Sequence, residues 1–170
     1  MQHSLSTCTV RSWRPSDAQS LVTHANNRAI WLNLRDRFPN PYTKRDATEF
    51  LKSVVGQFPE TMFAVAVDDA AIGSIGFVLQ RDVERVSAEI GYWLGEPFWG
   101  RGIATEALIA VTKLALEKHG LCRLFALPFA SNVASCRVLE KAGYTLEARL
   151  RRSAVKNGVI VDQCQYAYIP

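Results

Sequence analysis

The amino-acid sequence predicts a single α+β domain, with a mixed, mostly antiparallel central sheet and flanking helices. Its 170 residues, 48% of them hydrophobic, fit one domain with a sizeable core, which we expect to span residues 1–170. Strand and helix patterns follow one another in the order β, αα, βββ, α, β, α, ββ, which favours an α+β class. No repeat, linker or low-complexity segment interrupts this order.

The N-terminal third predicts one strand and two helices. Residues 8–13 alternate and contain Val and Thr, as is typical of a short strand. A helical stretch follows over about 15–35, opened by a Pro-Ser-Asp sequence. Thr43 and Asp46 then resemble a capping box, and the helix that they begin is expected to end near residue 59.

The remainder of the chain predicts a strand meander, two helices and a final hairpin. The predicted strands are 62–67, 71–79, 87–94, 121–129, 144–155 and 159–169, and the predicted helices follow Gly102 to about 119 and cover 132–142. Asp68-Asp69 is a plausible hairpin turn, and Asn157-Gly158 is the strongest hairpin dipeptide. The strands 62–67, 71–79 and 87–94 together indicate an antiparallel meander.

Composition and charge exclude several classes of protein. No apolar run is long enough for a transmembrane helix, and the first residues lack the basic and apolar regions of a secretory signal, so we expect a cytoplasmic protein without a membrane partner. The four cysteines form no CxxC pair and the three histidines are scattered, which predicts reduced thiols and no metal site. The net charge of +4 comes without a stripe of basic and aromatic residues, so nucleic acid is not an expected partner.

One denser basic patch lies near the C-terminus. It consists of Arg149, Arg151, Arg152 and Lys156, offset by Glu147. Such a patch is either a solvated surface or a source of attraction for an anionic ligand.

A glycine-rich turn lies between the strand 87–94 and the next helix, in the sequence Trp99-Gly100-Arg101-Gly102-Ile103-Ala104-Thr105. Glycines let the backbone turn tightly and approach a ligand closely. The start of a helix leaves N–H groups unpaired, with a partial positive charge that suits phosphate. The spacing has neither the GK[ST] of a Walker loop nor the third glycine of the dinucleotide fingerprint. The turn is therefore either an anion site of another kind or a simple tight turn.

Further motifs accompany this turn, and together they are far more specific than the turn alone. They are Ala88-Glu89-Ile90-Gly91-Tyr92-Trp93-Leu94, the run from Trp99 to Leu108, Asn132-Val133-Ala134-Ser135, and Leu139-Glu140-Lys141-Ala142-Gly143-Tyr144. In these motifs the sequence resembles the GNAT N-acetyltransferases, in particular the branch of the ribosomal-protein-alanine and -serine acetyltransferases. Trp99 stands at the first position of the family's pyrophosphate motif, where Gln or Arg is general and Trp is usual in this branch.

The resemblance implies acetyl-CoA as co-substrate and a sheet that splays around it. Pantetheine would lie between the strands 87–94 and 121–129, where backbone groups would bind it. The pyrophosphate would be bound by the N–H groups at the start of the next helix. The implied cofactor residues are Tyr92, Trp93, Leu94, Trp99, Gly100, Arg101, Gly102, Ile103, Ala104, Thr105, Asn132 and Ser135.

The implied reaction is acetyl transfer to a primary amine by direct attack in a ternary complex. The amine is protonated at neutral pH and must lose a proton, for which Glu89 is the candidate base unless it is only a solvent-facing carboxylate. Ser135 is the candidate donor to the leaving thiolate, and Asn132 is also a candidate helix N-cap. Cys136 is expected to be a buried structural cysteine, because no histidine is placed to activate it.

The sequence does not identify the amine that accepts the acetyl group. It could be a protein N-terminus, a polyamine, an amino acid or an aminoglycoside, and the enzyme could be a monomer or a homodimer. The aromatic residues Trp31, Phe38 and Tyr42 are either core or a wall of the acceptor site, next to a loop rich in proline. The alternative function is a non-catalytic acyl-CoA-binding sensor, which would need the turn but not Glu89 or Ser135. A nucleotide-binding protein is a weaker third.

Overall fold

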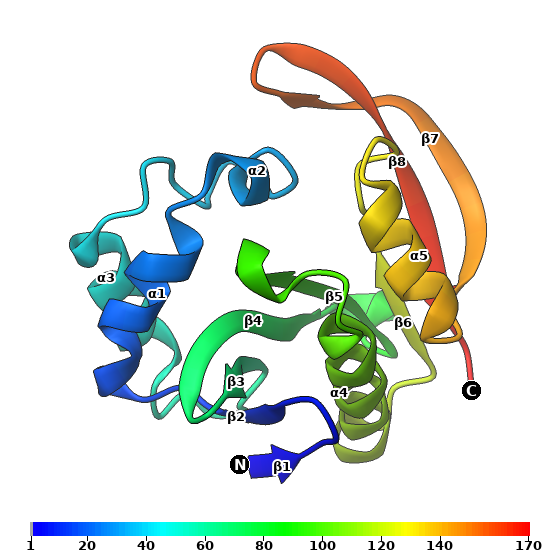
Figure 1. Ribbon diagram of the computed structural model, residues 1–170. Coiled ribbons are helices and arrows are strands. Elements are labelled where there is room, and N and C mark those ends of the chain that lie inside the picture. The colour runs from blue at the N-terminus through cyan, green and yellow to red at the C-terminus, as the bar shows by residue number, and fades with distance from the viewer. Residues whose placement is uncertain (1) are drawn as a thin grey trace. The chain divides into compact units, whose positions relative to one another are not determined.

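A computed structural model describes residues 2–170 and contains a mixed sheet with the strand order β1-β2-β3-β4-β5-β6-β8-β7 (Figure 1). The strands are β1 (Gln2–Ser4), β2 (Thr9–Ser12), β3 (Met62–Val67), β4 (Ala70–Leu79), β5 (Ser87–Leu94), β6 (Arg123–Ala126), β7 (Thr145–Lys156) and β8 (Val159–Tyr168). The helices are α1 (Ala18–Ala25), α2 (Arg28–Trp31), α3 (Lys44–Val54), α4 (Ile103–His119) and α5 (Val133–Lys141). Three short 3-10 turns are η1 (Pro15–Asp17), η2 (Asp82–Glu84) and η3 (Glu96–Phe98).

The strand pairing confirms the predicted α+β class. β5 and β6 run parallel, whereas β1–β2, β2–β3, β3–β4, β6–β8 and β7–β8 pair antiparallel. Both predicted hairpin turns form. Asp68 and Asp69 have φ of 49° and 65°, and Asn157 and Gly158 have φ of 50° and 75°. Two consecutive positive φ values are what a two-residue hairpin turn requires.

The predicted helix over residues 15–35 is wrong in its continuity. A 3-10 turn, η1, precedes α1, and α1 ends before Asn26. The side chain of Asn27 accepts hydrogen bonds from the backbone N–H groups of Ala29 (2.7 Å) and Ile30 (3.3 Å), so that it caps a separate short helix, α2. Asparagine competes for backbone donors in this way, which is why it favours helix starts over helix interiors.

The ends of α3 and β6 and the presence of β1 also differ from the sequence prediction. The predicted capping box at Thr43 and Asp46 is present, but α3 ends at Val54, because the following residues turn away with Gly56 at φ 74°. β6 ends at Ala126, shortly before Pro128, which has no N–H to donate to a ladder. β1 is an addition to the predicted strands, because its three residues are polar and exposed and give no alternating pattern.

The chain forms two compact units. The first contains the residues up to Gly76 together with Tyr92–Ala107, and the second contains Phe77–Gly91 together with Leu108–Pro170. In the first unit, α1 and α3 pack with the sheet around a core that includes Trp13, Leu21, Ala25, Tyr42, Ala47, Leu51, Val54, Ala64 and Ala71. In the second, β7 and β8 form a long hairpin, drawn orange to red in Figure 1.

A buried ion pair fixes the start of the first unit. Arg11 on β2 is 2% exposed and binds Asp17 of η1 with both guanidinium N–H groups, at 2.9 Å and 2.8 Å. Asp17 also accepts from the backbone N–H of Arg14 (2.9 Å). The second guanidinium nitrogen reaches the backbone carbonyl of Asp69 in the β3–β4 turn (2.8 Å). This network joins β2 and η1, which are close in sequence, to the distant β3–β4 turn.

Candidate functional site

The parallel ladder between β5 and β6 is short. It covers Ser87–Glu89 on β5 and Arg123–Phe125 on β6. Across its other edge β6 continues to pair with β8 as far as Ala126. Within residues 2–170 the two parallel strands share no ladder pair beyond Glu89, although β5 runs on to Leu94. Glu89, the candidate base, is half-buried at the last pair, and a Cβ added to Gly91 would meet no atom within 4 Å, so there is open space on the face of the strand to which that Cβ would point.

The end of β5 is packed closely against β4. The N–H of Gly95 donates to the carbonyl of Ile72 (2.8 Å). A Cβ on Gly73 would collide with the Trp93 carbonyl and lie 2.6 Å from a methyl group of Leu94, so only glycine fits there. The ring of Trp93 lies 5.7 Å from the ring of Phe38, edge to face. The predicted cofactor strand is therefore held rigidly on the side that faces β4.

The glycine turn leads directly into α4. Gly100 and Gly102 have φ of 74° and 81°, and a Cβ at either position would meet nothing within 4 Å. The N–H of Glu106 makes an intrahelical bond to the carbonyl of Gly102 (3.1 Å), so the N–H groups of the three residues between them belong to the unpaired first turn. The indole N–H of Trp99 donates to the Leu94 carbonyl (2.8 Å) and ties the turn to the end of β5. An open, donor-rich cradle of this kind fits a diphosphate.

Asn132 and Ser135 lie at the start of α5 in the second unit. The side-chain oxygen of Asn132 accepts from the backbone N–H of Ser135 (3.1 Å), which confirms the predicted N-cap. Both side chains are half-buried. The next residue, Cys136, is partly exposed, so the expectation of full burial is wrong. Burial nevertheless raises the pKa of its thiol, which lowers the fraction of reactive thiolate.

The three aromatic residues predicted for the acceptor site have different environments, although all belong to the first unit. Tyr42 is 5% exposed within the core, and burial raises its pKa to about 12. Phe38 is half-buried and lies 5.0 Å from the Tyr42 ring. Trp31 is half-buried on α2, with the guanidinium of Arg28 5.4 Å from its ring. The sequence left open whether these residues belong to the core or to a wall of the acceptor site. Tyr42 belongs to the core.

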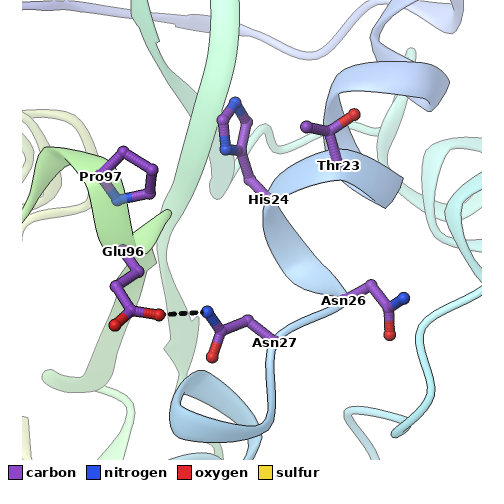
Figure 2. Close-up of a pocket in the computed structure, with 6 residues that line it drawn as sticks. All are labelled: Thr23, His24, Asn26, Asn27, Glu96 and Pro97. Carbon is purple, nitrogen blue, oxygen red and sulfur yellow. Dashed lines mark hydrogen bonds between the residues drawn. The ribbon is translucent and has the colours of Figure 1, made fainter.

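An open pocket of about 370 Å³ in the first unit, shown in Figure 2, has no counterpart among the sequence predictions. Its lining residues are Thr23, His24, Asn26, Asn27, Glu96 and Pro97. The amide of Asn27 donates to the Glu96 carboxylate (2.6 Å), and burial lowers the pKa of His24, whose ring lies against Phe98. The one available signal was the Asn26-Asn27 pair, which interrupts a helical pattern.

The basic patch is only partly a solvated surface. Arg149 donates to the carboxylate of Asp162 (2.9 Å), which also accepts from the backbone N–H of Arg152 (2.9 Å) at a bulge in β7. Glu147 pairs with Arg123 outside the patch. Lys156 is 5% exposed, so this residue does not belong to the solvated surface.

Membrane-spanning helices and metal clusters are both absent from residues 2–170. No helix in this range is long and apolar enough to cross a membrane. The same range contains no group of three or more His, Cys, Asp or Glu side chains arranged to hold a metal ion.

Comparison with known proteins identifies the family. A model of the acetyltransferase (GNAT) domain matches residues 8–145. The chain belongs to the GNAT acetyltransferase family. The match confirms the predicted enzyme class, a GNAT acetyltransferase.

Individual GNAT proteins support the predicted branch. The uncharacterized N-acetyltransferase YoaA of Bacillus subtilis (strain 168) is 36% identical over 58% of this chain and 55% of its own length. The ribosomal-protein-serine acetyltransferase of Escherichia coli (strain K12) is 32% identical over 64% of this chain and 60% of its own. The match thus covers between half and two thirds of the length of each of these two curated relatives.

The GNAT fold itself is confirmed by solved structures. A RimL ribosomal L7/L12 alpha-N-protein acetyltransferase, solved in complex with coenzyme A, superposes with a TM-score of 0.85. The two chains are 22% identical, and the match covers 97% of this chain and 95% of the other.

Proposed function

We propose that this GNAT chain moves the acetyl group of acetyl-CoA to a primary amine at a protein N-terminus, by direct attack in a ternary complex. One observation carries the proposal: the β5–β6 ladder stops at Glu89, and the same strand then leads through Tyr92–Leu94 into the open glycine turn. A candidate base, a strand edge and an anion cradle therefore follow one another along one segment. Both compact units would serve one acetyltransferase domain.

The cofactor contacts that we propose use backbone groups more than side chains. The N–H groups at the start of α4, from Gly102 to Thr105, would hold the pyrophosphate, with Trp99 fixing the turn and Arg101 close by. Backbone groups of Tyr92, Trp93 and Leu94 would bind the pantetheine arm, and an N–H there would polarise the thioester carbonyl. Asn132 would add a contact from α5. Acetyl-CoA supplies the activated acetyl group.

Two side chains would assist the reaction, one by taking the proton of the amine and the other by stabilising the charge on the leaving thiolate. Glu89 would take the proton of the ammonium group, directly or through water, because an amine attacks only in its neutral form. The hydroxyl of Ser135 would donate a hydrogen bond to the departing thiolate. Cys136 has no part in this scheme, since burial raises its pKa and disfavours the thiolate that a covalent route needs.

An N-terminal amine is the acceptor that these features favour. Its reference pKa of about 8 lies well below the lysine value of about 10.4, so a single carboxylate base has less work to do. Relatives of this chain include a protein whose name states that it acetylates a ribosomal protein at serine. Phe38 and Trp31 would line the approach, with Tyr42 supporting them from the core. A ribosomal acceptor would place the reaction in the cytoplasm.

A transfer assay tests the proposal. The purified chain is mixed with acetyl-CoA and one amine at a time: a peptide with a free N-terminal serine and no lysine, the same peptide with a blocked N-terminus, spermidine, and an aminoglycoside. Thiol release and the mass of the product are measured. We expect acetylation of the free peptide alone. Transfer only to spermidine or the aminoglycoside would overturn the N-terminal assignment, and binding of acetyl-CoA without transfer to any amine would support the sensor.

A further inference from the structure

The structure points to a positioning residue that acts on the cofactor turn from behind: we propose that Glu106, clamped by the Ser6–Thr7 turn, holds the start of α4 in its acetyl-CoA-binding geometry. The inference rests on the proposed role of the glycine turn. It concerns how the affinity of that turn is set, which neither the family match nor the relatives describe.

The Glu106 carboxylate is saturated by donors from one short segment. It accepts from the backbone N–H of Ser6 (2.8 Å), the Ser6 hydroxyl (2.6 Å), the backbone N–H of Thr7 (2.9 Å) and the Thr7 hydroxyl. Each carboxylate oxygen thus receives one hydroxyl and one N–H from the same residue. Hydrogen bonds to an ionised acceptor are about twice as strong as neutral ones. Four of them make a specific connection between segments about 100 residues apart.

The donor segment is itself anchored. Ser6 and Thr7 are the central residues of the β1–β2 hairpin turn, which is closed by the N–H of Leu5 donating to the carbonyl of Cys8 (2.8 Å). Cys8 is 7% exposed, so its side chain fixes the turn to the core. From there β2 continues into the ladder with β3. The clamp therefore joins the first turn of α4 to the sheet.

The Glu106 carboxylate lies where a movement of the backbone would most affect the proposed pyrophosphate site. Glu106 is the first residue of α4 with an intrahelical N–H bond, to Gly102, and the residues from Gly102 to Thr105 carry the donors proposed for the pyrophosphate. Gly100 and Gly102, which precede α4, have left-handed φ, and a Cβ built on either would meet no atom within 4 Å. A turn that is open on the ligand side needs its rigidity from the other side, and a preorganised site binds more tightly.

The clamp also solves a problem of charge. A carboxylate in the first turn of a helix stabilises that helix but repels an anion at the same terminus. The four donors from Ser6 and Thr7 stabilise this charge: burial raises the pKa of Glu106, but the hydrogen bonds outweigh it and lower that pKa to about 2. Ser6 and Thr7 lie outside residues 8–145, the part of the chain that the family model matches.

The test is the variant E106Q, with E49Q as matched control. Glu49 is an exposed helix carboxylate paired with Arg45, away from the turn. Glutamine keeps the shape of Glu106 but presents its own N–H₂ to two of the four donors. The KM for acetyl-CoA and the kcat are measured with the acetylated peptide as product, together with direct binding of coenzyme A and the melting temperature.

For E106Q we expect the KM for acetyl-CoA and the Kd for coenzyme A to rise about tenfold, equivalent to about 1.4 kcal/mol. The kcat at saturation should stay within about twofold, and E49Q should match wild type. If the carboxylate acted only through its charge, E106Q would bind coenzyme A more tightly, which would overturn the proposal. Unchanged KM and Kd in a folded E106Q would overturn it as well.

A second set of variants keeps the test valid if E106Q does not fold. S6A/T7A removes two hydroxyl donors and keeps both backbone N–H donors. The KM for acetyl-CoA should therefore rise about threefold, a smaller effect than the tenfold rise expected for E106Q. T7S keeps a hydroxyl at position 7 and should behave as wild type. T48A controls for the loss of an exposed threonine hydroxyl elsewhere. A purely structural role would lower the melting temperature of S6A/T7A without raising KM. Failure of wild type to bind coenzyme A would instead refute the proposed function.

Discussion

The substitution D17N tests the physical account of the first unit most severely. It leaves the shape of the side chain almost unchanged but removes the charge that faces Arg11, whose side chain is 2% exposed. The guanidinium keeps its proton in the variant, because an arginine side chain is not deprotonated in proteins. Breaking a buried ion pair by removing one partner costs about 3–5 kcal/mol, because a buried charge is left uncompensated.

The structure supplies a matched control for this variant in D69N. Asp69 also lies beside Arg11, but its side chain is 71% exposed and 3.6 Å from the guanidinium. Solvent screens such a pair, so D69N should cost only about 0–1 kcal/mol. Its backbone carbonyl, which accepts from Arg11 at 2.8 Å, is retained. Asparagine also tolerates the left-handed φ of 65° found there.

Urea unfolding and calorimetry measure the difference. In a chain of this length each kcal/mol lowers the melting temperature by about 2–4 °C, so D17N should lose about 6–20 °C. D69N should lose about 4 °C or less on the same scale. Equal losses in the two variants would refute the reasoning, because they would mean that burial of the pair contributes nothing beyond a surface contact.

Other consequences concern the chemistry and the pH dependence. E89Q should lower turnover roughly 10²–10⁴-fold, with acetyl-CoA affinity kept and the deficit shrinking as pH rises; wild-type turnover at neutral pH would remove Glu89 as the base. C136A should keep most of the activity, a result that a trapped acetyl-cysteine in mass spectrometry would reverse. The depressed pKa of Glu106 stabilises the fold above its ordinary value of 4.5, and this contribution is lost as pH falls toward about 2. Acid unfolding of E106Q should therefore depend less on pH over that interval, and curves of equal slope would contradict the clamp.

Local signals explain why much of the fold could be predicted from the sequence. β3 has the predicted bounds, 62–67, because a continuous apolar run between turn residues is typical of a buried strand. β5 also has its predicted bounds, 87–94, although it contains Ser87 and Glu89. The Asn157-Gly158 turn and the Thr43 cap follow from residue types that fit few other conformations. Asn27 shows the limit of this reasoning, since its choice between helix interior and cap depends on competing backbone donors.

The candidate site likewise contains features that could be predicted from the sequence and features that could not. The glycine turn could be predicted, because two glycines before a helix indicate positive φ and an exposed backbone, and both conditions are met. The contacts of Glu106 could not, because its partners Ser6 and Thr7 lie 100 and 99 residues away and follow a strand with no sequence signal. The burial of Tyr42 was equally invisible, since an aromatic residue beside prolines suits a loop as well as a core.

The most direct test of the central claim is calorimetric titration of acetyl-CoA into wild type, G102E and G56E. Gly56 follows α3 with φ of 74°, close to the 81° of Gly102, and both positions have open space around a Cβ, so the two variants carry the same strain and the same added charge. We expect G102E to lose binding, because its carboxylate enters the diphosphate cradle, while G56E binds as wild type does. A folded G102E with wild-type affinity would contradict the assignment of this turn as the acetyl-CoA site.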